Sequence, residues 1–265
     1  MQFDSATAVV TGAASGLGAA TAAEFARRGA RVIGFDLPAA VEAAAEGRTD
    51  PGVQLVGVDV TDAEQISAGL DIATGGSATG GPATGGTAPL RLVVNCAGIG
   101  PSARTVGKNG PHDAALFRKV IEINLIGTFL VTSLAAERIA AAEPDEQGQR
   151  GVIVNTASIA AFDGQIGQVA YAASKAGVAG LTLPLARDLS SLGIRVCTIA
   201  PGIIDTPMMS TVSEEFRATL AAGVPFPKRF GLPEEYARLA ATIVDNDYLN
   251  GETIRMDGAL RMAPR

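Results

Sequence analysis

Short apolar runs rich in β-branched residues alternate along the chain with stretches of helical periodicity. Strands are predicted near residues 7–11, 31–36, 53–58, 90–95, 151–157, 194–200 and 252–256. Helices are predicted near 16–28, 62–73, 113–142, 165–191 and 233–245, with a shorter helix within 38–46 and a broken one within 208–222. This alternation is typical of βαβ units, which bring parallel strands into one sheet and place helices on its faces. The pattern predicts an α/β chain with a doubly wound parallel sheet of about seven strands.

The length of the chain fits a single domain over residues 1–265, because one hydrophobic core can serve up to about 250–300 residues. One stretch departs from the alternating pattern, since residues 74–89 repeat glycine, threonine and proline. Such a composition buries too little apolar area to offset the entropy lost on ordering. These residues are therefore predicted to form a surface loop before the fourth strand.

A glycine-rich turn, residues 11–18, joins the first predicted strand to the first predicted helix. Glycine permits a tight turn and lets a pyrophosphate approach bare backbone. The helix that follows presents free N–H groups and its positive dipole end to the anion. The turn predicts a dinucleotide site of the Rossmann type, with cofactor contacts from Gly12, Ser15, Gly16, Leu17 and Gly18.

An acidic residue, Asp36, ends the second predicted strand. A carboxylate at this position accepts hydrogen bonds from ribose hydroxyls and repels a 2′-phosphate. Residues 12–18 and 37–41 contain no arginine or lysine that would neutralise such a phosphate. The sequence therefore predicts NAD rather than NADP as the cofactor.

Tyr171 and Lys175 stand four residues apart in the predicted helix 165–191, so their side chains share one face. A lysine ammonium beside a phenol favours the phenolate and lowers a pKa that is about 10 in free tyrosine. Such a tyrosine can exchange a proton with an alcohol or a carbonyl near neutral pH. Ser158 lies upstream, where a strand opens into a loop, and its hydroxyl is expected to hold the same substrate oxygen.

Together these residues resemble the short-chain dehydrogenase/reductase superfamily. The resemblance is carried further by Asn95-Cys96-Ala97-Gly98, by Asp59-Val60, by Asn124 in the long helix and by residues 201–207. It implies an NAD-dependent oxidoreductase with a single-domain Rossmann fold, whose catalytic set is Asn124, Ser158, Tyr171 and Lys175. It also implies cofactor contacts from Asp59, Val60, Cys96, Ala97, Gly98, Tyr171, Lys175, Pro201, Ile204 and Thr206.

The resemblance assigns roles within this set. Lys175 is expected to lower the pKa of Tyr171 and to hold the nicotinamide ribose. Asn124 is expected to position a water and the helix backbone for a proton relay. Cys96 stands where the family has a second asparagine, so that position is expected to contribute backbone contacts but no amide.

Residues 155–168, 181–188, 224–227 and 250–259 resemble, within this family, the type-2 3-hydroxyacyl-CoA dehydrogenases. That resemblance implies a homotetramer that oxidises a small-molecule substrate, an L-3-hydroxyacyl-CoA, to the 3-oxoacyl-CoA with Tyr171 as proton acceptor. Substrate contacts are expected from Ser158, Gln165, Tyr171, Met208 and Met209. Hydroxysteroids or other secondary alcohols are alternative substrates for the same pocket. A non-catalytic NAD-binding structural or regulatory subunit is an alternative of another class, which the intact catalytic set disfavours.

Charge and cysteine content narrow the range of partners. With 21 Lys+Arg against 27 Asp+Glu, the net charge of −6 offers no general attraction to nucleic acid or anionic lipid. No uninterrupted apolar run reaches the roughly 18 residues of a membrane span, so no membrane contact is predicted. Two cysteines without metal spacing indicate a reducing compartment, and a cytoplasmic protein is predicted. His112 is the single histidine, and no metal site is predicted.

Overall fold

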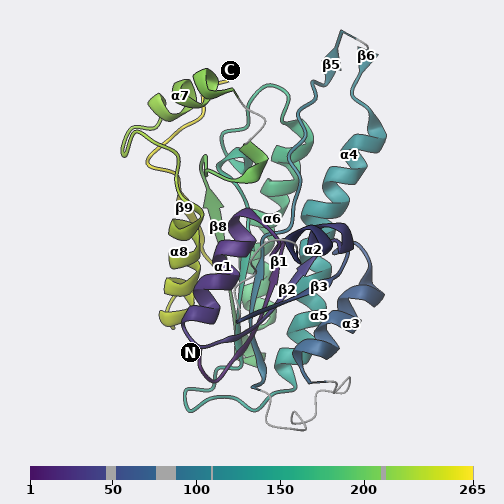
Figure 1. Ribbon diagram of the computed structural model, residues 1–265, viewed down its shortest axis with the longest axis vertical. Coiled ribbons are helices and arrows are strands. Elements are labelled where there is room, and N and C mark those ends of the chain that lie inside the picture. The colour runs from purple at the N-terminus through teal and green to yellow at the C-terminus, as the bar shows by residue number, and fades with distance from the viewer. Residues whose placement is uncertain (46–51, 76–87, 109, 210–212, 265) are drawn as a thin grey trace.

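The computed structural model describes residues 1–45, 52–75, 88–108, 110–209 and 213–264. Within these residues seven parallel strands form one sheet in the order β3-β2-β1-β4-β7-β8-β9 (Figure 1). The strands are β1 (Thr7–Thr11), β2 (Arg31–Asp36), β3 (Val53–Gly57), β4 (Leu90–Asn95), β7 (Gly151–Thr156), β8 (Ile194–Pro201) and β9 (Thr253–Met256). Strand order reverses beside β1, which places a topological switch point between β1 and β4.

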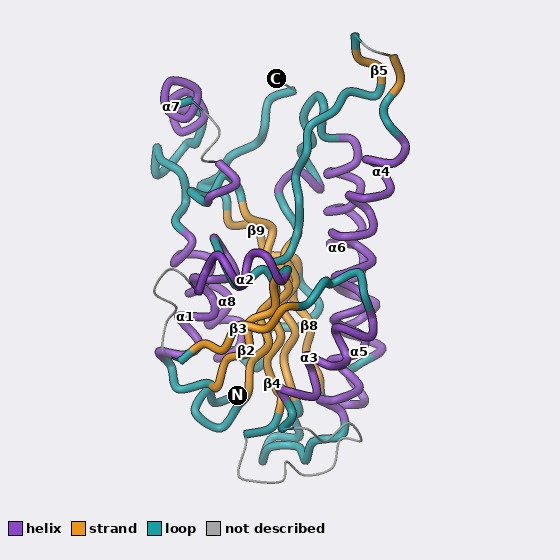
Figure 2. The backbone as a smooth tube through the Cα atoms, turned by 45° about the vertical axis from the view of Figure 1, so that its right-hand side comes forward, coloured by secondary structure: helices purple, strands orange, loops and turns teal. Residues whose placement is uncertain are grey.

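Helices cover both faces of this sheet, as the turned view in Figure 2 shows. On one face lie α1 (Gly16–Arg27) and α8 (Pro233–Asp245), and on the other lie α3 (Ala63–Ala73), α5 (Thr128–Ala140) and α6 (Val169–Asp188). The described chain also forms α2 (Pro38–Ala45), α4 (Ala114–Ile121), α7 (Glu214–Ala222), a π-helical turn at Glu122–Gly127 and 3-10 turns at Ile159–Ala161, Ser190–Leu192 and Pro207–Met209. The predicted doubly wound Rossmann fold is confirmed.

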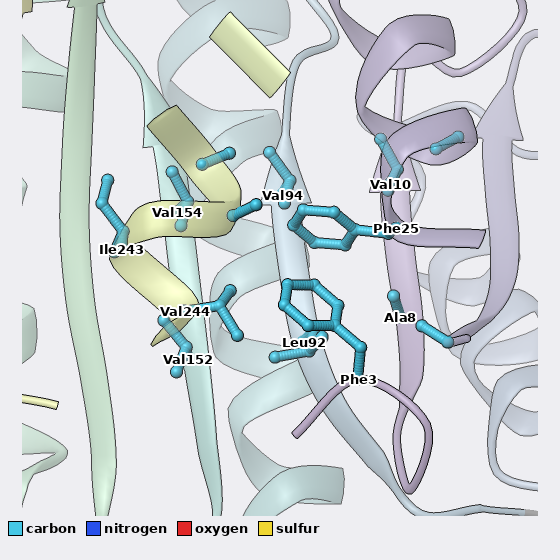
Figure 3. Close-up of a cluster of buried hydrophobic side chains, with 14 of the residues drawn as sticks. Phe3, Ala8, Val10, Phe25, Leu92, Val94, Val152, Val154, Ile243 and Val244 are labelled. Atoms are coloured by element: carbon cyan, nitrogen blue, oxygen red, sulfur yellow. The ribbon is translucent and has the colours of Figure 1, made fainter. Parts of the chain in front are cut away.

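The hydrophobic core is divided by the sheet into two parts. On the side of α1 and α8, one cluster includes Phe25, Val94, Val154 and Ile243, and the Phe25 ring lies edge-on to Phe3 with centroids 5.0 Å apart (Figure 3). A second cluster, on the side of α3 and α5, includes Val9, Ile66, Leu70, Val131 and Ile139. Successive residues along a strand therefore point to opposite sides of the sheet, so that Ala8 and Val10 belong to the first cluster and Val9 to the second. Because both faces are buried, the central strands read as continuous apolar runs.

The predicted helix 113–142 is one long helix in which α4, the π-helical turn and α5 follow without a break. By length and composition this segment, Ala114–Ala140, is apolar enough to cross a membrane, which the sequence interpretation had not recognised. Its inner face explains much of that apolar character, since Val131, Ala135 and Ile139 are fully buried against the sheet. The helix belongs to the core of the fold.

Two local features differ from the predictions, and a third prediction is left untested. Helix α6 begins at Val169 rather than near 165, because Gly167 adopts φ +90° in a turn that precedes it. An unpredicted hairpin, β5 (Val106–Gly107) and β6 (Gly110–Pro111), projects beyond α4 (Figure 1). The predicted surface loop at 74–89 lies mostly outside the described residues.

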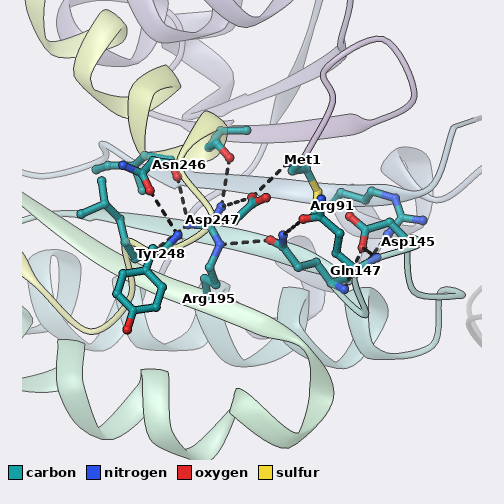
Figure 4. Close-up of polar contacts among 12 residues, drawn as sticks. Met1, Arg91, Asp145, Gln147, Arg195, Asn246, Asp247 and Tyr248 are labelled. Atoms are coloured by element: carbon teal, nitrogen blue, oxygen red, sulfur yellow. Dashed lines mark hydrogen bonds and ion pairs between the residues drawn. The ribbon is translucent and has the colours of Figure 1, made fainter.

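Arg195 ties elements together at the amino end of β8. It is 6% exposed, and its guanidinium donates to the carbonyls of Ile243, Val244 and Leu249 at 2.8–3.0 Å. Its Nε donates to Gln149, and Asp247 lies 3.6 Å away (Figure 4). Two of these carbonyls close the last turn of α8, so a cation here also complements the helix dipole.

Candidate active site

The carboxyl ends of the parallel strands meet at one edge of the sheet. The glycine-rich turn follows β1, Asp36 ends β2, and Cys96 follows β4. Ser158 follows β7, and the predicted nicotinamide segment 201–207 begins at the end of β8. In open α/β sheets ligands bind in the crevice at this edge, beside the switch point. The fold therefore brings together residues that are far apart in the sequence.

The turn after β1 presents backbone rather than side chains. Gly12 and Gly16 have φ of +67° and +53°, which favour glycine. A Cβ on Gly18 would overlap the carbonyl of Gly12, and a Cβ on Gly12 would lie 3.0 Å from the amide nitrogen of Ala97. Ser15 precedes α1, but its side chain accepts no hydrogen bond from the first turn of the helix. The N–H groups of that turn are left uncapped by Ser15 and are suited to hold a pyrophosphate.

Asp36 lies beside this turn. One carboxylate oxygen accepts from the N–H of Ala14 at 2.9 Å, and the other accepts from the N–H of Leu37 at 2.9 Å. Each carboxylate oxygen can accept a second hydrogen bond. The structure thus fixes a negative charge at the edge of the turn with acceptor capacity remaining for ribose hydroxyls.

The segment after β4 is fastened to β1 through its backbone. The hydroxyl oxygen of Thr11 accepts from the N–H groups of Cys96 and Ala97, both at 3.0 Å. A Cβ on Gly98 would lie 3.1 Å from Oδ1 of Asn124 and 3.5 Å from Nζ of Lys175. The backbone at Gly98 therefore lies close to two residues of the predicted catalytic set, and the contacts of residues 96–98 with a cofactor stay a prediction.

Asp59 and Val60, the pair expected near adenine, follow β3. Oδ1 of Asp59 accepts from both the N–H and the hydroxyl of Thr61, at 2.9 and 2.8 Å, which shapes its own loop. Val60 is buried and packs so closely on the long helix that a Cβ on Gly127 would lie 2.9 Å from it. The contact of these residues with adenine stays a prediction.

Asn124 lies in the π-helical turn and is fully buried. Its amide exchanges two hydrogen bonds with the backbone of Ile99, at 2.8 and 2.9 Å, and donates to the hydroxyl of Ser174 at 3.0 Å. The side chain therefore connects the segment after β4 with α6. The structure shows this positioning role, and the expected water relay stays a prediction.

Lys175 is 4% exposed, and its ammonium donates to the carbonyl of Thr156 at 2.8 Å. Burial disfavours the charged form and lowers the pKa of Lys175 to about 8, with the nearby Cys96 thiol opposing this effect. The amine is still mostly protonated at neutral pH. It lies 5.9 Å from the centre of the Tyr171 ring.

Tyr171 is half-buried on α6. Burial raises the pKa of its phenol above the usual value, and a hydrogen bond with the Ser158 hydroxyl partly offsets that rise. The predicted net lowering of the Tyr171 pKa is therefore not seen in the chain by itself, because burial raises it while the Lys175 ammonium donates to the Thr156 carbonyl. The structure brings Ser158, Tyr171 and Lys175 close together, and their catalytic roles stay a prediction.

The segment after β8 lies against the glycine-rich turn. A Cβ on Gly16 would lie 3.4 Å from the side chain of Thr206, so the two segments approach each other closely. Ile204 is buried and forms a β-bridge with Gly231, which fixes the course of the segment that begins at Pro201. Thr206 is thus well placed to contact a dinucleotide held by the turn.

The expected substrate residues are distributed unevenly. Gln165 lines an open groove of about 390 Å³ together with Arg104, Val106, Ile166 and Val169. One N–H of its side-chain amide donates to the carbonyl of Ala263 at 2.9 Å, and its contact with a substrate stays a prediction. Met209 is half-buried, and the side chain of Met208 lies outside the described part of the structure.

Several residues that support the site were missed in the sequence. Thr156, Ser174 and Thr11 each accept a hydrogen bond from a predicted site residue or its neighbour. Tyr236 of α8 is fully buried, and its hydroxyl lies 2.7 Å from the hydroxyl of Thr156. Spacing gives no signal for Tyr236, because it lies 80 residues from its partner in the sequence.

No group of three or more metal-ligating side chains occurs in the part of the chain that the structure describes. The predicted site residues supply hydroxyls, the amide of Asn124, the carboxylates of Asp36 and Asp59 and the ammonium of Lys175.

Comparisons with known proteins agree with this geometry. A family model described as short chain dehydrogenase matches residues 6–216. The chain is 51% identical over 261 residues to 3-hydroxyacyl-CoA dehydrogenase type-2 of Drosophila melanogaster, covering 98% of each chain. It is 45% identical to the human protein of the same name, covering 97% of this chain and 95% of that one. A crystal structure of 3-hydroxyacyl-CoA dehydrogenase type-2 from Mycobacterium avium superposes with a TM-score of 0.90 at 45% identity, covering 99% and 98%.

Proposed function

Since the chain belongs to the short-chain dehydrogenase family, we propose that it oxidises an L-3-hydroxyacyl-CoA to the 3-oxoacyl-CoA with NAD. The observation that carries this proposal is the grouping of half-buried Tyr171 with buried Ser158 and Lys175 at the carboxyl edge of the sheet. The names of relatives that match over nearly the full chain support the substrate class.

The residues at the site fit NAD. The backbone of the glycine-rich turn and the start of α1 would hold the pyrophosphate, and Asp36 would accept from the adenosine ribose. When bound there, NAD supplies the acceptor for the hydride that leaves the alcohol carbon. A 2′-phosphate would meet the Asp36 carboxylate without a lysine or arginine in residues 12–18 or 37–41.

Three side chains are proposed to bind the substrate and accept its proton. The Ser158 hydroxyl holds the substrate oxygen, and Tyr171 accepts its proton as the phenolate. Burial of the phenol raises its pKa, so the phenolate depends on positive charge nearby. Lys175 supplies such a charge, because its pKa of about 8 keeps it mostly protonated at neutral pH.

The groove that contains Gln165 supports an acyl-CoA. Ile166 and Val169 expose apolar surface there, and Arg104 adds a positive charge on its wall. An acyl thioester joined to a phosphorylated carrier presents both an apolar part and anionic groups. A steroid or a simple secondary alcohol would use the apolar part alone.

Turnover of defined substrates tests the proposal. Purified protein is given NAD with L- or D-3-hydroxybutyryl-CoA, a longer L-3-hydroxyacyl-CoA, a 17β-hydroxysteroid or a simple secondary alcohol, and NADH absorbance is followed. The L-acyl-CoA substrates are expected to have the highest kcat/KM. A higher value for the steroid or the simple alcohol would favour those alternatives.

Tyr171→Phe identifies the proton acceptor. The variant keeps the ring packing and removes the exchangeable proton, so turnover is expected to fall by at least about 100-fold while NAD binding changes little. For the wild type, the rate of oxidation is expected to rise with pH, because the raised pKa of Tyr171 keeps the phenolate scarce at low pH. A Tyr171→Phe variant with a tenth or more of wild-type activity would refute this mechanism.

The proposed assembly is a homotetramer. Two exposed apolar side chains on the outer face of the long helix support it, Ile126 at 37% and Phe129 at 43% exposure. On α6, Leu183 is 45% exposed and Gly180 has open space where a Cβ would stand. Light scattering coupled to size exclusion measures the mass, and a monodisperse active monomer would contradict the proposal.

A further inference from the structure

Segment 257–264 lies across the substrate side of the site. Leu260 is 8% exposed and packs with Ile159 and Val224, while Ile203 and Met262 pack around them. Ile159 directly follows Ser158, Ile203 belongs to the segment after β8, and Val224 follows α7. Leu260 therefore closes the junction of three segments that surround the substrate side of Ser158.

Hydrogen bonds attach the same segment to loop 162–168, which leads into the helix of Tyr171. The N–H of Ile166 donates to the carbonyl of Pro264 at 3.0 Å. The amide of Gln165 donates to the carbonyl of Ala263 at 2.9 Å. The loop and the segment thus form one wall, although their residues lie about 98 positions apart, as for Gln165 and Ala263.

Arg255, at the end of β9, binds both loop 162–168 and segment 257–264. One guanidinium nitrogen donates to Asp163 at 2.6 Å and to the carbonyl of Leu260 at 3.0 Å, and Nε donates to Asp257 at 2.8 Å. Its guanidinium also lies over the ring of Phe162, 5.4 Å from the centroid. The fixed fork of arginine can satisfy several acceptors at once, which the single ammonium of lysine cannot do in the same geometry.

We propose that Arg255 is a positioning residue for substrate binding, which fixes segment 257–264 against loop 162–168 so that Leu260 bounds the acyl side of the pocket. Arg255 acts through Asp163 and the segment and does not touch the reacting atoms. The inference rests on the proposed dehydrogenase function. Its consequence is a loss of substrate affinity, with the chemistry at Tyr171 and the cofactor site unaffected.

Steady-state kinetics of Arg255→Gln and Asp163→Asn test this role, with Arg27→Gln as a matched control. The control breaks an ion pair with Glu24 on α1, where the Arg27 side chain is 70% exposed. Both test variants are expected to raise the KM for L-3-hydroxybutyryl-CoA about tenfold, with kcat and the KM for NAD changed less than about twofold. Arg255→Lys should restore part of the loss, and the control should match the wild type.

The double variant Arg255→Gln/Asp163→Asn separates a shared interaction from two independent effects. It is expected to be no worse than Arg255→Gln alone, because Asp163→Asn removes a contact that Arg255→Gln has already lost. Unchanged substrate KM in both single variants, additive losses, or equal changes in kcat and both KM values would overturn the proposal. If Arg255→Gln does not fold, the substrate KM of Asp163→Asn alone decides the proposal.

Hydrogen exchange distinguishes this inference from the proposed function. If the wild type shows no turnover, the proposed function fails, and the wall is judged by exchange at the Ile166 amide. Arg255→Gln is expected to speed exchange there by at least about tenfold. Unchanged exchange at Ile166 would overturn the role of Arg255.

Discussion

At the scale of single residues, burial rather than sequence spacing sets the protonation of the catalytic pair. Tyr171 and Lys175 are both partly or fully removed from water, and each pKa moves toward the neutral form. A spacing of four residues predicts a shared helix face but contains no information on desolvation. The residue identities were therefore predictable from the sequence, and the direction of the tyrosine pKa was not.

Lys175→Met is expected to stabilise the cofactor-free protein while nearly abolishing turnover. The folded-state pKa of about 8 lies below the usual 10.5, so the unfolded chain binds more protons between these values. The contribution of Lys175 to the free energy of unfolding of the wild type therefore becomes more favourable as the pH rises from 8 to 10.5. Relief of desolvation is worth about 3 kcal/mol at pH 7, and loss of the hydrogen bond to the Thr156 carbonyl leaves a net gain on the order of 2 kcal/mol. The gain shrinks between pH 8 and 10.5.

Denaturant unfolding of both proteins at pH 7 and pH 10 measures this difference. Variant and wild type are compared at each pH, so that titration of other groups cancels. If Lys175→Met and the wild type differed in free energy of unfolding by the same amount at both pH values, burial would not be what lowers the pKa of Lys175.

Asp36 is expected to set the choice of cofactor. The wild type should prefer NAD over NADP by at least about tenfold in kcat/KM, equivalent to about 1.4 kcal/mol. Asp36→Ala combined with Leu37→Arg should narrow this gap, since it removes the repulsion and adds a cation at a position that is 52% exposed. Leu37→Arg alone is the control and should keep the preference for NAD. Equal use of both cofactors by the wild type would disprove the assignment.

At the scale of elements, the connection between β1 and α1 depends on the absence of one methyl group. A Cβ on Gly18 would meet the backbone carbonyls of Gly12 and Thr11, which cannot move without disturbing the turn. Gly18→Ala is expected to cost at least about 2 kcal/mol of stability and to weaken NAD binding.

Ser15→Ala is the matched control in the same turn. The Ser15 side chain accepts no hydrogen bond from α1, so its loss is expected to change stability by less than about 0.5 kcal/mol. Thermal unfolding and NAD titration of the two variants give both quantities. A Gly18→Ala protein as stable as Ser15→Ala would show that the turn relaxes.

Most elements were predictable because their apolar residues follow clear periods. Helix α8 begins and ends as predicted, with Pro233 at its first position and an apolar face that includes Tyr236. The hairpin β5–β6 was not predicted, because two-residue strands carry no periodic signal. The contacts of Arg255 were also missed, since they depend on tertiary proximity between residues 92 positions apart.

At the scale of the molecule, Arg195 holds the end of the sheet that is opposite the catalytic edge. Its guanidinium serves three backbone carbonyls that no water reaches easily, since the side chain is 6% exposed (Figure 4). Arg195→Met would leave these acceptors unpaired and is expected to cost about 2–4 kcal/mol. KM values should stay within about twofold of the wild type, because the site lies at the other edge.

Denaturant unfolding and steady-state kinetics on Arg195→Met check both halves of this prediction. The exposed Arg27→Gln variant again provides the comparison, with an expected loss below about 1 kcal/mol. An Arg195→Met protein with wild-type stability would mean that the carbonyls find other donors.

The strand order has a consequence for how the chain assembles during synthesis. β2 pairs with β1 and β3 with β2, after which β4 joins the free side of β1 and β7, β8 and β9 follow outward in turn. Each new strand is thus added at an existing edge, and none has to insert between strands that are already paired. Chains emerge from the ribosome with the N-terminal part first, and an unpaired strand edge promotes aggregation. The exposed edge of β1 is therefore covered as soon as β4 becomes available, without any hydrogen-bonded ladder having to open.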